Sequence, residues 1–389
     1  MNPRRALHGL KVAYYRQTPR VRHFLGGKRR VLLYVSSDTM LPHLLRYYDS
    51  VKALPGLHFD YFYPSMPANA EHNPTLERLL SLPIHRVDAI GARVWDLIVC
   101  ADMPTPAGIS KEMTPLLYVN HGLHIVSADG GENLYCYGAL ALDEHGAPLF
   151  SRMCEPNAAI AEAMRAHNPA MSRTMVFTGF KFADVIERAV EHRAETRRAL
   201  GVRDDECLVG FFGTWREHSL FHALGAGLFD ACAALRPKGY QFLFSIHPNE
   251  YRRYDPAIEP MGALVEQQRA RGMLVRSPGE PFEAPLAACD VIVSDYSSMA
   301  ESAVIAGRKL IFSPYPDGMV WKHSLTARLK QALPTLASVD ALESTLDAVR
   351  AAPLDPMIAE ARARLVCADH DEIARRVTLE LIGEGATDA

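Results

Sequence analysis

The chain lacks the features that mark disulfide-stapled, secreted and membrane-spanning proteins. Its seven cysteines form no C-x-x-C pair and lie at positions 100, 136, 154, 207, 232, 289 and 367. This spacing excludes a disulfide framework and a zinc site, and it fits small core thiols in a reducing compartment. The N-terminus has no apolar leader, and no apolar run approaches the ~18–20 residues that a membrane span needs. These absences predict a cytoplasmic protein.

Acidic residues are absent from the first 30 positions, although the formal net charge of the whole chain is only −3. This segment holds nine basic residues: Arg4, Arg5, Lys11, Arg16, Arg20, Arg22, Lys28, Arg29 and Arg30. Such an arm binds anionic lipid at about 1 kcal/mol per basic residue near the surface. Residues 1–30 therefore indicate either peripheral attachment to the inner face of the cytoplasmic membrane or a solvated terminus. The overall charge balance gives no indication of nucleic acid as a partner.

Internal repeats and low-complexity tracts are also missing, and a chain of 389 residues is long enough for two domains. Short β-rich runs alternate with segments of helical spacing, which predicts an α/β fold with mostly parallel sheets. Helical spacing is found at 157–167, 184–201 and 219–237. The expected strands are the runs near 30–35, 59–64, 95–101, 115–122, 175–180, 208–213, 242–248, 290–295 and 309–313.

The order of these segments predicts two Rossmann-like domains that face each other across a cleft at their strand C-termini, where α/β folds bind ligands. A charged helical stretch from Asp184 to Gly201 separates the two series of strands. The expected organisation is a basic arm (1–29), an N-terminal acceptor domain (30–185), a C-terminal donor-nucleotide domain (186–355) and a helical tail (356–389). The tail is expected to cross back onto the first domain.

A candidate phosphate site lies in "DVIVSDYSSMAESAVIAG", residues 290–307. A buried strand ends at Asp295, and a helix is expected directly afterwards. Ser298 and Glu301 fit an S-x-x-E capping box, and the free N–H groups of a helix start attract phosphate. Asp295, Ser297 and Ser298 are therefore predicted to line the binding site of a phosphate-bearing ligand, with the two hydroxyls as hydrogen-bond donors. The structural alternative is that Ser298 only caps the helix and Glu301 reciprocates.

Three other strand exits carry side chains that suit a transfer reaction. His247 follows the strand in "FLFSIHP", where the next proline forces an extended exit. His121 follows the strand in "PLLYVNHG", where Gly122 permits a tight turn, and a histidine there suits a general base. Thr214 and Arg216 in "FFGTWRE" suit phosphate contacts. The structural alternative for each histidine is a hydrogen-bonded side chain at a strand end.

Together these blocks resemble the CDP-glycerol glycerophosphotransferases, which are teichoic acid primases and polymerases with relatives in bacterial capsule synthesis. The family shows a Pro-Thr-Trp/Phe-Arg turn, a His-Pro pair and an Asp-Tyr-Ser-Ser block in this order, as do "FFGTWRE", "IHPN" and "SDYSSMAES" here. His121-Gly122 matches the upstream His-Gly pair, and the resemblance covers roughly residues 95–380.

The sequence departs from the family pattern at three places. "TGFKFAD" (178–184) matches a Thr-Gly-x-Pro-Arg-x-Asp turn in part only, because Lys181-Phe182 stands where the family has Pro-Arg. Gly213 replaces the usual proline before Thr214. The stretch "LHIVSADGGENLY" after the His-Gly pair differs from the Thr-Pro-Leu-Lys type of the family. These departures concern mainly the acceptor side of the enzyme.

The resemblance implies a B-type glycosyltransferase fold and a transferase that needs neither a cofactor nor a metal ion. It implies that His121 is the base on the acceptor hydroxyl and that His247, Ser297 and Ser298 contact the donor phosphates. Thr214 and Arg216 would lie near the same pocket, and Glu301 would contact the ribose hydroxyls. No Asp-x-Asp motif stands in the context that a metal-dependent transferase would require.

The implied reaction moves a glycerol-phosphate, or a related polyol-phosphate, from a CDP-activated donor to a hydroxyl of a cell-surface glycan or lipid-linked acceptor, with release of CMP. Two enzyme alternatives share the architecture. One is a glycosyltransferase that uses a nucleotide sugar for capsule or lipopolysaccharide synthesis. The other is a nucleotide-sugar 2-epimerase-like enzyme, which usually carries an acidic, glycine-rich block in place of "SDYSSMAES". A non-enzymatic alternative is an inactive scaffold at the membrane.

Overall fold

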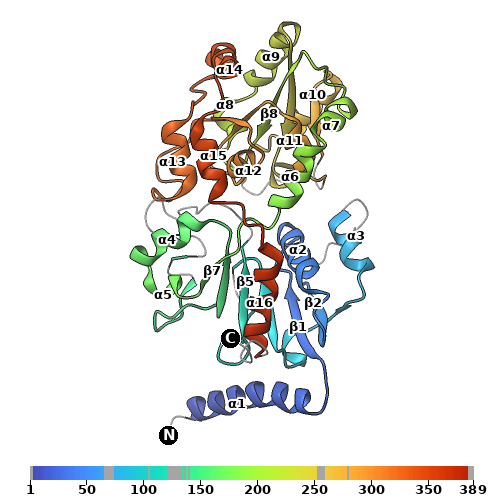
Figure 1. The fold of residues 1–389 in the computed structure, drawn as a ribbon, viewed down its shortest axis with the longest axis vertical. Helices are drawn as coiled ribbons and strands as arrows, with labels where there is room; N and C mark the ends of the chain where they lie inside the picture. Colours follow the sequence, from blue (N-terminus) through green and yellow to red (C-terminus); the bar gives the residue numbers. More distant parts are fainter. Residues whose placement is uncertain are drawn as a thin grey trace. The chain divides into compact units, whose positions relative to one another are not determined.

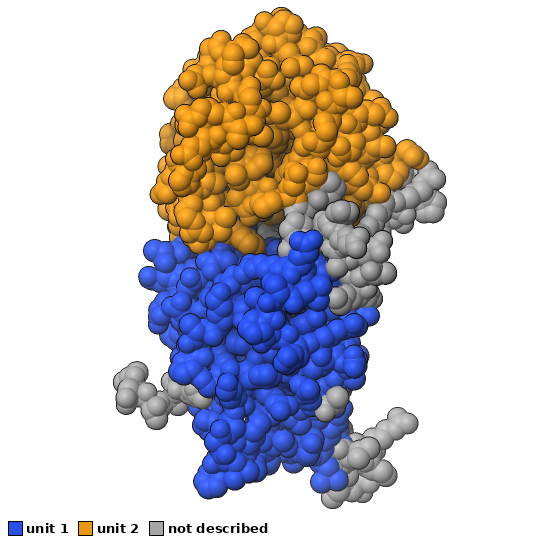
Figure 2. Space-filling model, turned by 90° about the vertical axis from the view of Figure 1, so that its right-hand side faces the viewer, with its two compact units in different colours: residues 1–122, 135–181, 367–389 blue, residues 123–134, 182–366 orange. Residues whose placement is uncertain are grey.

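The computed structural model describes residues 3–64, 74–103, 106–120, 134, 137–138, 141–251, 259–277 and 280–383. The chain forms two compact units, which Figure 2 shows in different colours. Unit 1 consists of residues 1–122, 135–181 and 367–389, and unit 2 consists of residues 123–134 and 182–366. After Lys181 the chain stays in unit 2 until it returns to unit 1 at Cys367.

Unit 1 is built on a seven-stranded parallel sheet with the order β3-β2-β1-β4-β5-β6-β7. The strands are β1 (Arg29–Tyr34), β2 (Leu57–Phe62), β3 (His85–Arg86), β4 (Leu97–Cys100), β5 (Leu116–Val119), β6 (Arg152–Glu155) and β7 (Met175–Phe177). The central strands β4 and β5 are buried along their whole length, as expected for apolar runs in a parallel sheet covered on both faces.

Two helices from opposite ends of the chain cover unit 1 side by side. Helix α2 (Leu41–Val51) and helix α16 (His370–Ile382) pack together in Figure 1, and the Tyr47 hydroxyl lies 2.6 Å from the Thr378 hydroxyl. Leu44, Leu45 and Val377 belong to one buried apolar cluster with strands β1, β2, β4 and β5. Unit 1 also contains the helices α3 (Pro74–Ser81), α4 (Ala158–His167) and α5 (Pro169–Ser172).

The basic N-terminal segment forms helix α1 (Pro3–Phe24), which packs at the amino-terminal edge of the unit 1 sheet. The Lys11 ammonium donates to the Gly108 carbonyl at 3.0 Å, and Arg16 Nε donates to the Glu112 carbonyl at 2.7 Å. Arg22 forms an ion pair with the buried carboxylate of Asp96, which also accepts the Arg30 backbone N–H at 2.6 Å. Three of the basic side chains of α1 therefore form hydrogen bonds or ion pairs with other residues of unit 1.

Unit 2 contains a five-stranded parallel sheet with the order β10-β9-β8-β11-β12. The strands are β8 (Cys207–Phe212), β9 (Tyr240–Ser245), β10 (Leu274–Arg276), β11 (Val291–Ser294) and β12 (Lys309–Phe312). The pairing register aligns Phe212 with both Ser245 and Ser294, so the strands end level with one another. The segments that follow them therefore leave along a single edge.

Helices cover this second sheet, and an aromatic core formed by Phe211, Phe221, Phe229, Phe242 and Phe244 fills one side of it. The helices are α6 (Ala183–Glu191), α7 (Arg193–Ala199), α8 (Leu220–Leu224), α9 (Gly227–Leu235), α10 (Gly262–Ala270), α11 (Glu283–Ala288), α12 (Met299–Ile305), α13 (Leu325–Ala332), α14 (Leu342–Ala351) and α15 (Pro356–Ala363).

The α/β class with two mostly parallel sheets, predicted from the sequence, is confirmed. Every predicted strand overlaps an observed one, whereas β3, β6 and β10 were not predicted. Two predicted helices are each divided. The 184–201 segment breaks at His192 between α6 and α7, and the 219–237 segment breaks at Gly225, whose φ of 69° cannot continue a helix.

Candidate functional site

Segments that follow three strands of unit 2 meet at the carboxyl edge of its sheet. The Thr214 N–H, after β8, donates to the Asp295 carboxylate, after β11, at 2.8 Å. The Trp215 ring, after β8, stacks on the His247 ring, after β9, with centroids 6.1 Å apart and planes 24° apart. The structure thus brings together the strand exits that the sequence singled out in this unit.

The turn after β8 has an unusual backbone. Arg216 has φ = 82° and is the sole non-glycine residue with positive φ in the described part of the chain. Its guanidinium carbon lies 4.2 Å from the centroid of the Trp215 ring, on which it stacks. Arg216, Trp215 and His247 therefore form a layered group, in which Arg216 is the exposed residue.

His247 is a neutral hydrogen-bond donor in this arrangement. Its Nδ1 accepts the backbone N–H of Asn249 at 3.1 Å, which places the ring proton on Nε2. Burial and, to a smaller extent, the nearby Arg276 guanidinium together lower the pKa of His247 to about 4. At neutral pH the imidazole is therefore uncharged and carries an N–H group at Nε2.

Asp295 organises the backbone around the site. Its carboxylate is fully buried and accepts the N–H groups of Thr214 at 2.8 Å, Leu220 at 2.9 Å and Ser297 at 2.9 Å. Burial raises the pKa of Asp295 to about 6, and these hydrogen bonds act in the opposite direction. Both oxygens face backbone groups, so a direct contact between Asp295 and the donor stays a prediction.

The predicted capping box at α12 is wrong. Ser298 precedes α12 but has helical dihedral angles (φ −63°, ψ −8°) and forms no side-chain cap. A serine needs an extended backbone at this position for its hydroxyl to reach the first N–H groups of the helix. Instead, the Ser297 hydroxyl accepts the Met299 N–H at 3.3 Å. Ser297 is buried, whereas Ser298 is half-buried. Ser297, and not Ser298, is therefore the serine whose hydroxyl accepts a backbone N–H at the start of α12.

Glu301 does not reach back to Ser298 as a capping box requires. Its side chain is fully buried, and Oε1 accepts the Thr326 hydroxyl of helix α13 at 2.9 Å. This contact ties α12 to α13. The predicted role of Glu301 at the ribose stays a prediction.

Two residues of this edge were missed by the sequence reasoning. Arg276 ends β10, next to β9, and its Nε donates to the Ser245 hydroxyl at 2.8 Å. Glu250, three residues after His247, is buried behind the turn that carries Arg216. In the sequence, Arg276 is an arginine in a short β-rich run and Glu250 is an acidic residue after a His-Pro pair. Neither pattern predicts which residue the side chain contacts.

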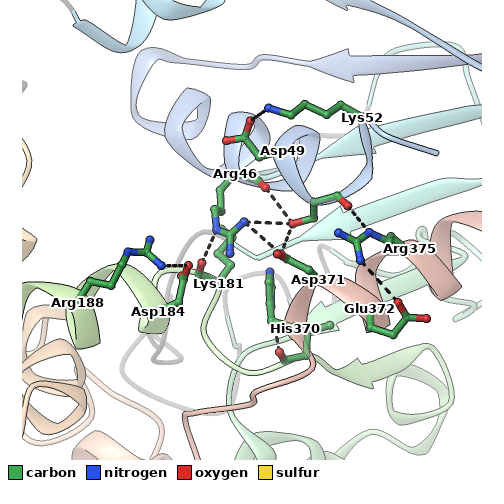
Figure 3. Close-up of polar contacts among 12 residues, drawn as sticks. Arg46, Asp49, Lys52, Lys181, Asp184, Arg188, His370, Asp371, Glu372 and Arg375 are labelled. Carbon is green, nitrogen blue, oxygen red and sulfur yellow. Dashed lines mark hydrogen bonds and ion pairs between the residues drawn. The ribbon is translucent and has the colours of Figure 1, made fainter.

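His121, the predicted base, lies outside the described residues. The strand that precedes it in the sequence, β5, is held by Lys181, whose ammonium donates to the carbonyls of Val119 (3.3 Å) and Asn120. Burial lowers the pKa of Lys181 to about 7. The Lys181 carbonyl in turn accepts Arg46 Nε at 2.9 Å, and Figure 3 shows Arg46 reaching both this carbonyl and the Asp371 carboxylate.

A small cavity lies beside Lys181 at the carboxyl edge of the unit 1 sheet. Its volume is about 20 Å³, enough for about one water molecule, and its lining includes Asn120, Thr178 and His370. Nearby, Glu155 is fully buried and accepts the Tyr137 hydroxyl at 2.6 Å. Burial raises the pKa of Glu155 to about 8, because few groups compensate a negative charge there.

Residues 153–302 match the sequence model of a family described as CDP-Glycerol:Poly(glycerophosphate) glycerophosphotransferase. The resemblance to this family is confirmed. The matched segment runs from β6 into the first turn of α12, so it contains all the predicted donor-site residues of unit 2 but not His121. The family match supports an enzyme of the glycerophosphotransferase and glycosyltransferase type.

Solved structures share the fold at low sequence identity. The wall teichoic acid polymerase TagF matches with a TM-score of 0.62 and 13% identity, covering 92% of this chain and 90% of that one. A TagF variant soaked with CDPG matches with a TM-score of 0.61 and 14% identity, covering 93% and 90%. The MnaA–UDP structure from S. aureus matches with a TM-score of 0.61 and 12% identity, covering 92% and 98%. The fold is thus the B-type glycosyltransferase fold. No curated protein sequence matches the chain.

Proposed function

We propose that the protein transfers a glycerol-phosphate, or a related polyol-phosphate, from a CDP-activated donor to a hydroxyl group of a cell-surface glycan or lipid-linked acceptor, with release of CMP. The observation that carries the proposal is the group formed by Arg216, Trp215 and His247 at the strand exits of unit 2. This group lies in the segment that matches the glycerophosphotransferase family. It pairs a guanidinium with a neutral N–H donor, which suits a diphosphate.

In the proposed reaction, the acceptor hydroxyl oxygen bonds to the phosphorus that carries glycerol, and the bond from this phosphorus to the bridging oxygen of CMP breaks. The electron pair leaves with CMP, and His121, as the proposed base, takes the hydroxyl proton. Negative charge on the transferred group faces the Arg216 guanidinium and the His247 Nε2–H. Such transfers depend on positioning and charge stabilisation more than on covalent catalysis. No step of the proposal uses a metal ion.

Ser298 is the better candidate of the two serines for a phosphate contact. The Ser297 hydroxyl already accepts the Met299 N–H and lies 3.2 Å from the Ser294 hydroxyl. Helix α12 has only 7 residues, so its dipole is small and the hydroxyl, rather than the helix start, is the proposed ligand. This refines the phosphate site that the sequence predicted.

A nucleotide-sugar enzyme of the same fold, either a glycosyltransferase or a 2-epimerase-like enzyme, is the second candidate. The observation that favours it is the equal structural likeness to the MnaA–UDP complex, whose TM-score of 0.61 matches that of the TagF complex. The two candidates differ in the nucleotide that unit 2 prefers. Cytidine nucleotides support the first proposal, and uridine nucleotides support the second.

Peripheral attachment to an anionic membrane is proposed for helix α1. Most of the exposed large apolar side chains of the described residues lie on this helix, with Leu10 69%, Tyr14 61% and Val21 57% exposed. At about 100° per residue, these three side chains and Phe24 lie on one face of the helix. An exposed apolar stripe on a basic helix suits the interface of an anionic bilayer. No helix in the described part of the chain is long and apolar enough to cross a membrane.

Thermal-shift measurements on the full chain test the donor. We expect CDP-glycerol or CDP-ribitol to stabilise the protein, by about 2.7 kcal/mol at 100 times the Kd, and CMP to stabilise it more than UMP. Stabilisation by UDP-sugars and UMP instead would transfer the assignment to the nucleotide-sugar candidate. Stabilisation by none of these nucleotides would remove the donor-site proposal altogether.

A further inference from the structure

Glu250 joins three segments around the turn after β8. The carboxylate is 4% exposed, and its Oε1 accepts the Arg216 backbone N–H at 3.0 Å. Its Oε2 accepts His222 Nε2 at 3.0 Å, from helix α8, and the Met261 N–H at 3.0 Å, directly before α10. Both oxygens of one buried carboxylate are therefore used, and one of them binds the N–H of the residue with positive φ.

Arg216 needs such a partner because its conformation is unfavourable. A left-handed backbone costs an L-residue with a side chain on the order of 1–2 kcal/mol, so it persists only where surrounding contacts impose it. The turn is held on both sides of Arg216, since Asp295 accepts the N–H groups of Thr214 and Leu220. Glu250 contributes the hydrogen bond at Arg216 itself.

The backbone conformation decides where the guanidinium lies. With φ = 82°, the Arg216 side chain turns over the Trp215 ring, 4.2 Å from its centroid, and Trp215 in turn stacks on His247. Were φ negative, the side chain would leave the turn in another direction and the layered group would lose its outer member. The Trp215 carbonyl also accepts the Tyr296 hydroxyl at 3.3 Å, which fixes the middle of the group.

We infer that Glu250 is a positioning residue that holds Arg216 in its left-handed conformation and thereby directs the guanidinium to the phosphates of a nucleoside-diphosphate donor. The inference rests on the proposed function, because it takes Arg216 to be the phosphate contact. Glu250 does not touch the ligand in this arrangement and acts through Arg216.

A purely structural role is the competing explanation, since Glu250 also holds His222 and the start of α10. A double-mutant cycle separates the two, with the full chain and titration calorimetry against CDP-glycerol. The variants are E250Q, which keeps the shape but loses the charge, R216G, which removes the guanidinium and accepts positive φ without strain, and the double variant. E266Q on α10 is the matched control, because Glu266 contacts Tyr251 and Arg269 and not the turn.

We expect R216G to weaken CDP-glycerol binding about ten- to a hundredfold, the usual loss for one charged hydrogen-bonding group. E250Q should weaken it about three- to tenfold in the wild-type background and not measurably in the R216G background. CMP should follow the same pattern, whereas cytidine, which lacks a phosphate, should bind equally to wild type and E250Q. E266Q should bind CDP-glycerol as wild type does.

Each other outcome overturns a distinct statement. Unchanged affinity in R216G removes Arg216 as the phosphate contact, and with it this part of the proposed function. A loss in R216G together with normal binding by E250Q overturns the inference alone. An E250Q effect of equal size in both backgrounds assigns Glu250 to general structure and also overturns it. If E250Q does not fold, E250D is used in the same cycle, because it keeps the charge and withdraws the carboxylate by one methylene.

Discussion

Replacing Lys181 with methionine should change how the stability of unit 1 depends on pH. Lys181 is 7% exposed, and burial lowers the pKa of its ammonium group to about 7 from a reference value of 10.5. Between these two values the unfolded chain binds a proton that the folded protein lacks, so this group makes stability rise with pH across the window. At about 1.4 kcal/mol per pH unit, the gain between pH 7.5 and 9.5 is roughly 2–3 kcal/mol. The K181M variant should lack this gain.

Urea unfolding at pH 7.5, 8.5 and 9.5 measures the effect. Trp95 is the buried tryptophan of unit 1, and replacing Trp215 and Trp321 of unit 2 with phenylalanine makes fluorescence report unit 1 alone. The difference in unfolding free energy between wild type and K181M should then grow in favour of wild type by about 2–3 kcal/mol from pH 7.5 to 9.5.

K52M is the control, because Lys52 is a half-exposed lysine in the same unit, paired with Asp49. A constant difference between K181M and wild type at all three pH values would refute the buried-ammonium reasoning. So would a pH dependence of the same size in K52M.

Three further predictions concern the proposed activity. H121A should lower kcat about 10²–10⁴-fold with CDP-glycerol affinity unchanged, the share expected of a general base, and near-normal turnover would remove His121 from the mechanism. S297A should cost about 0.5–2 kcal/mol of stability, because its hydroxyl accepts the Met299 N–H, whereas S298A should weaken CDP-glycerol binding. Equal affinities of the two variants in calorimetry would reject that division. Replacing Leu10 and Val21 together with glutamate should release the protein from anionic vesicles in a cosedimentation assay, and unchanged binding would contradict the role of α1.

Strands were predictable where burial on both faces leaves an unbroken apolar run. Strand β8, "CLVGFF", and strand β11, "VIVS", have this pattern. Strands β6 and β10 escaped because each is short and includes a charged side chain. The Glu155 carboxyl in β6 accepts hydrogen bonds from the Tyr137 hydroxyl and the Asn157 N–H, and Arg276 in β10 donates to Ser245. Such partners come from the fold and leave no trace in local hydrophobicity.

The candidate site was likewise predictable from the sequence only in part. Its residues could be found from the sequence because parallel strands end at one edge, which the register of β8, β9 and β11 provides. The separate roles of Ser297 and Ser298 could not, since they depend on a single pair of dihedral angles at Ser298. The contact of Glu250 with Arg216 spans 34 positions and is governed by a backbone conformation that no motif encodes.

The return of the chain to unit 1 at Cys367 sets an order for folding during synthesis. Residues 182–366 of unit 2 are all synthesised before the last helix of unit 1 is made. Until α16 emerges, the apolar groups of α2 and the sheet that pack on Val377 stay uncovered. The half of the protein that is translated first is therefore the half that is completed last. The apolar surface that α16 covers stays exposed while unit 2 is synthesised. We therefore expect the nascent chain to depend most on chaperones during this interval.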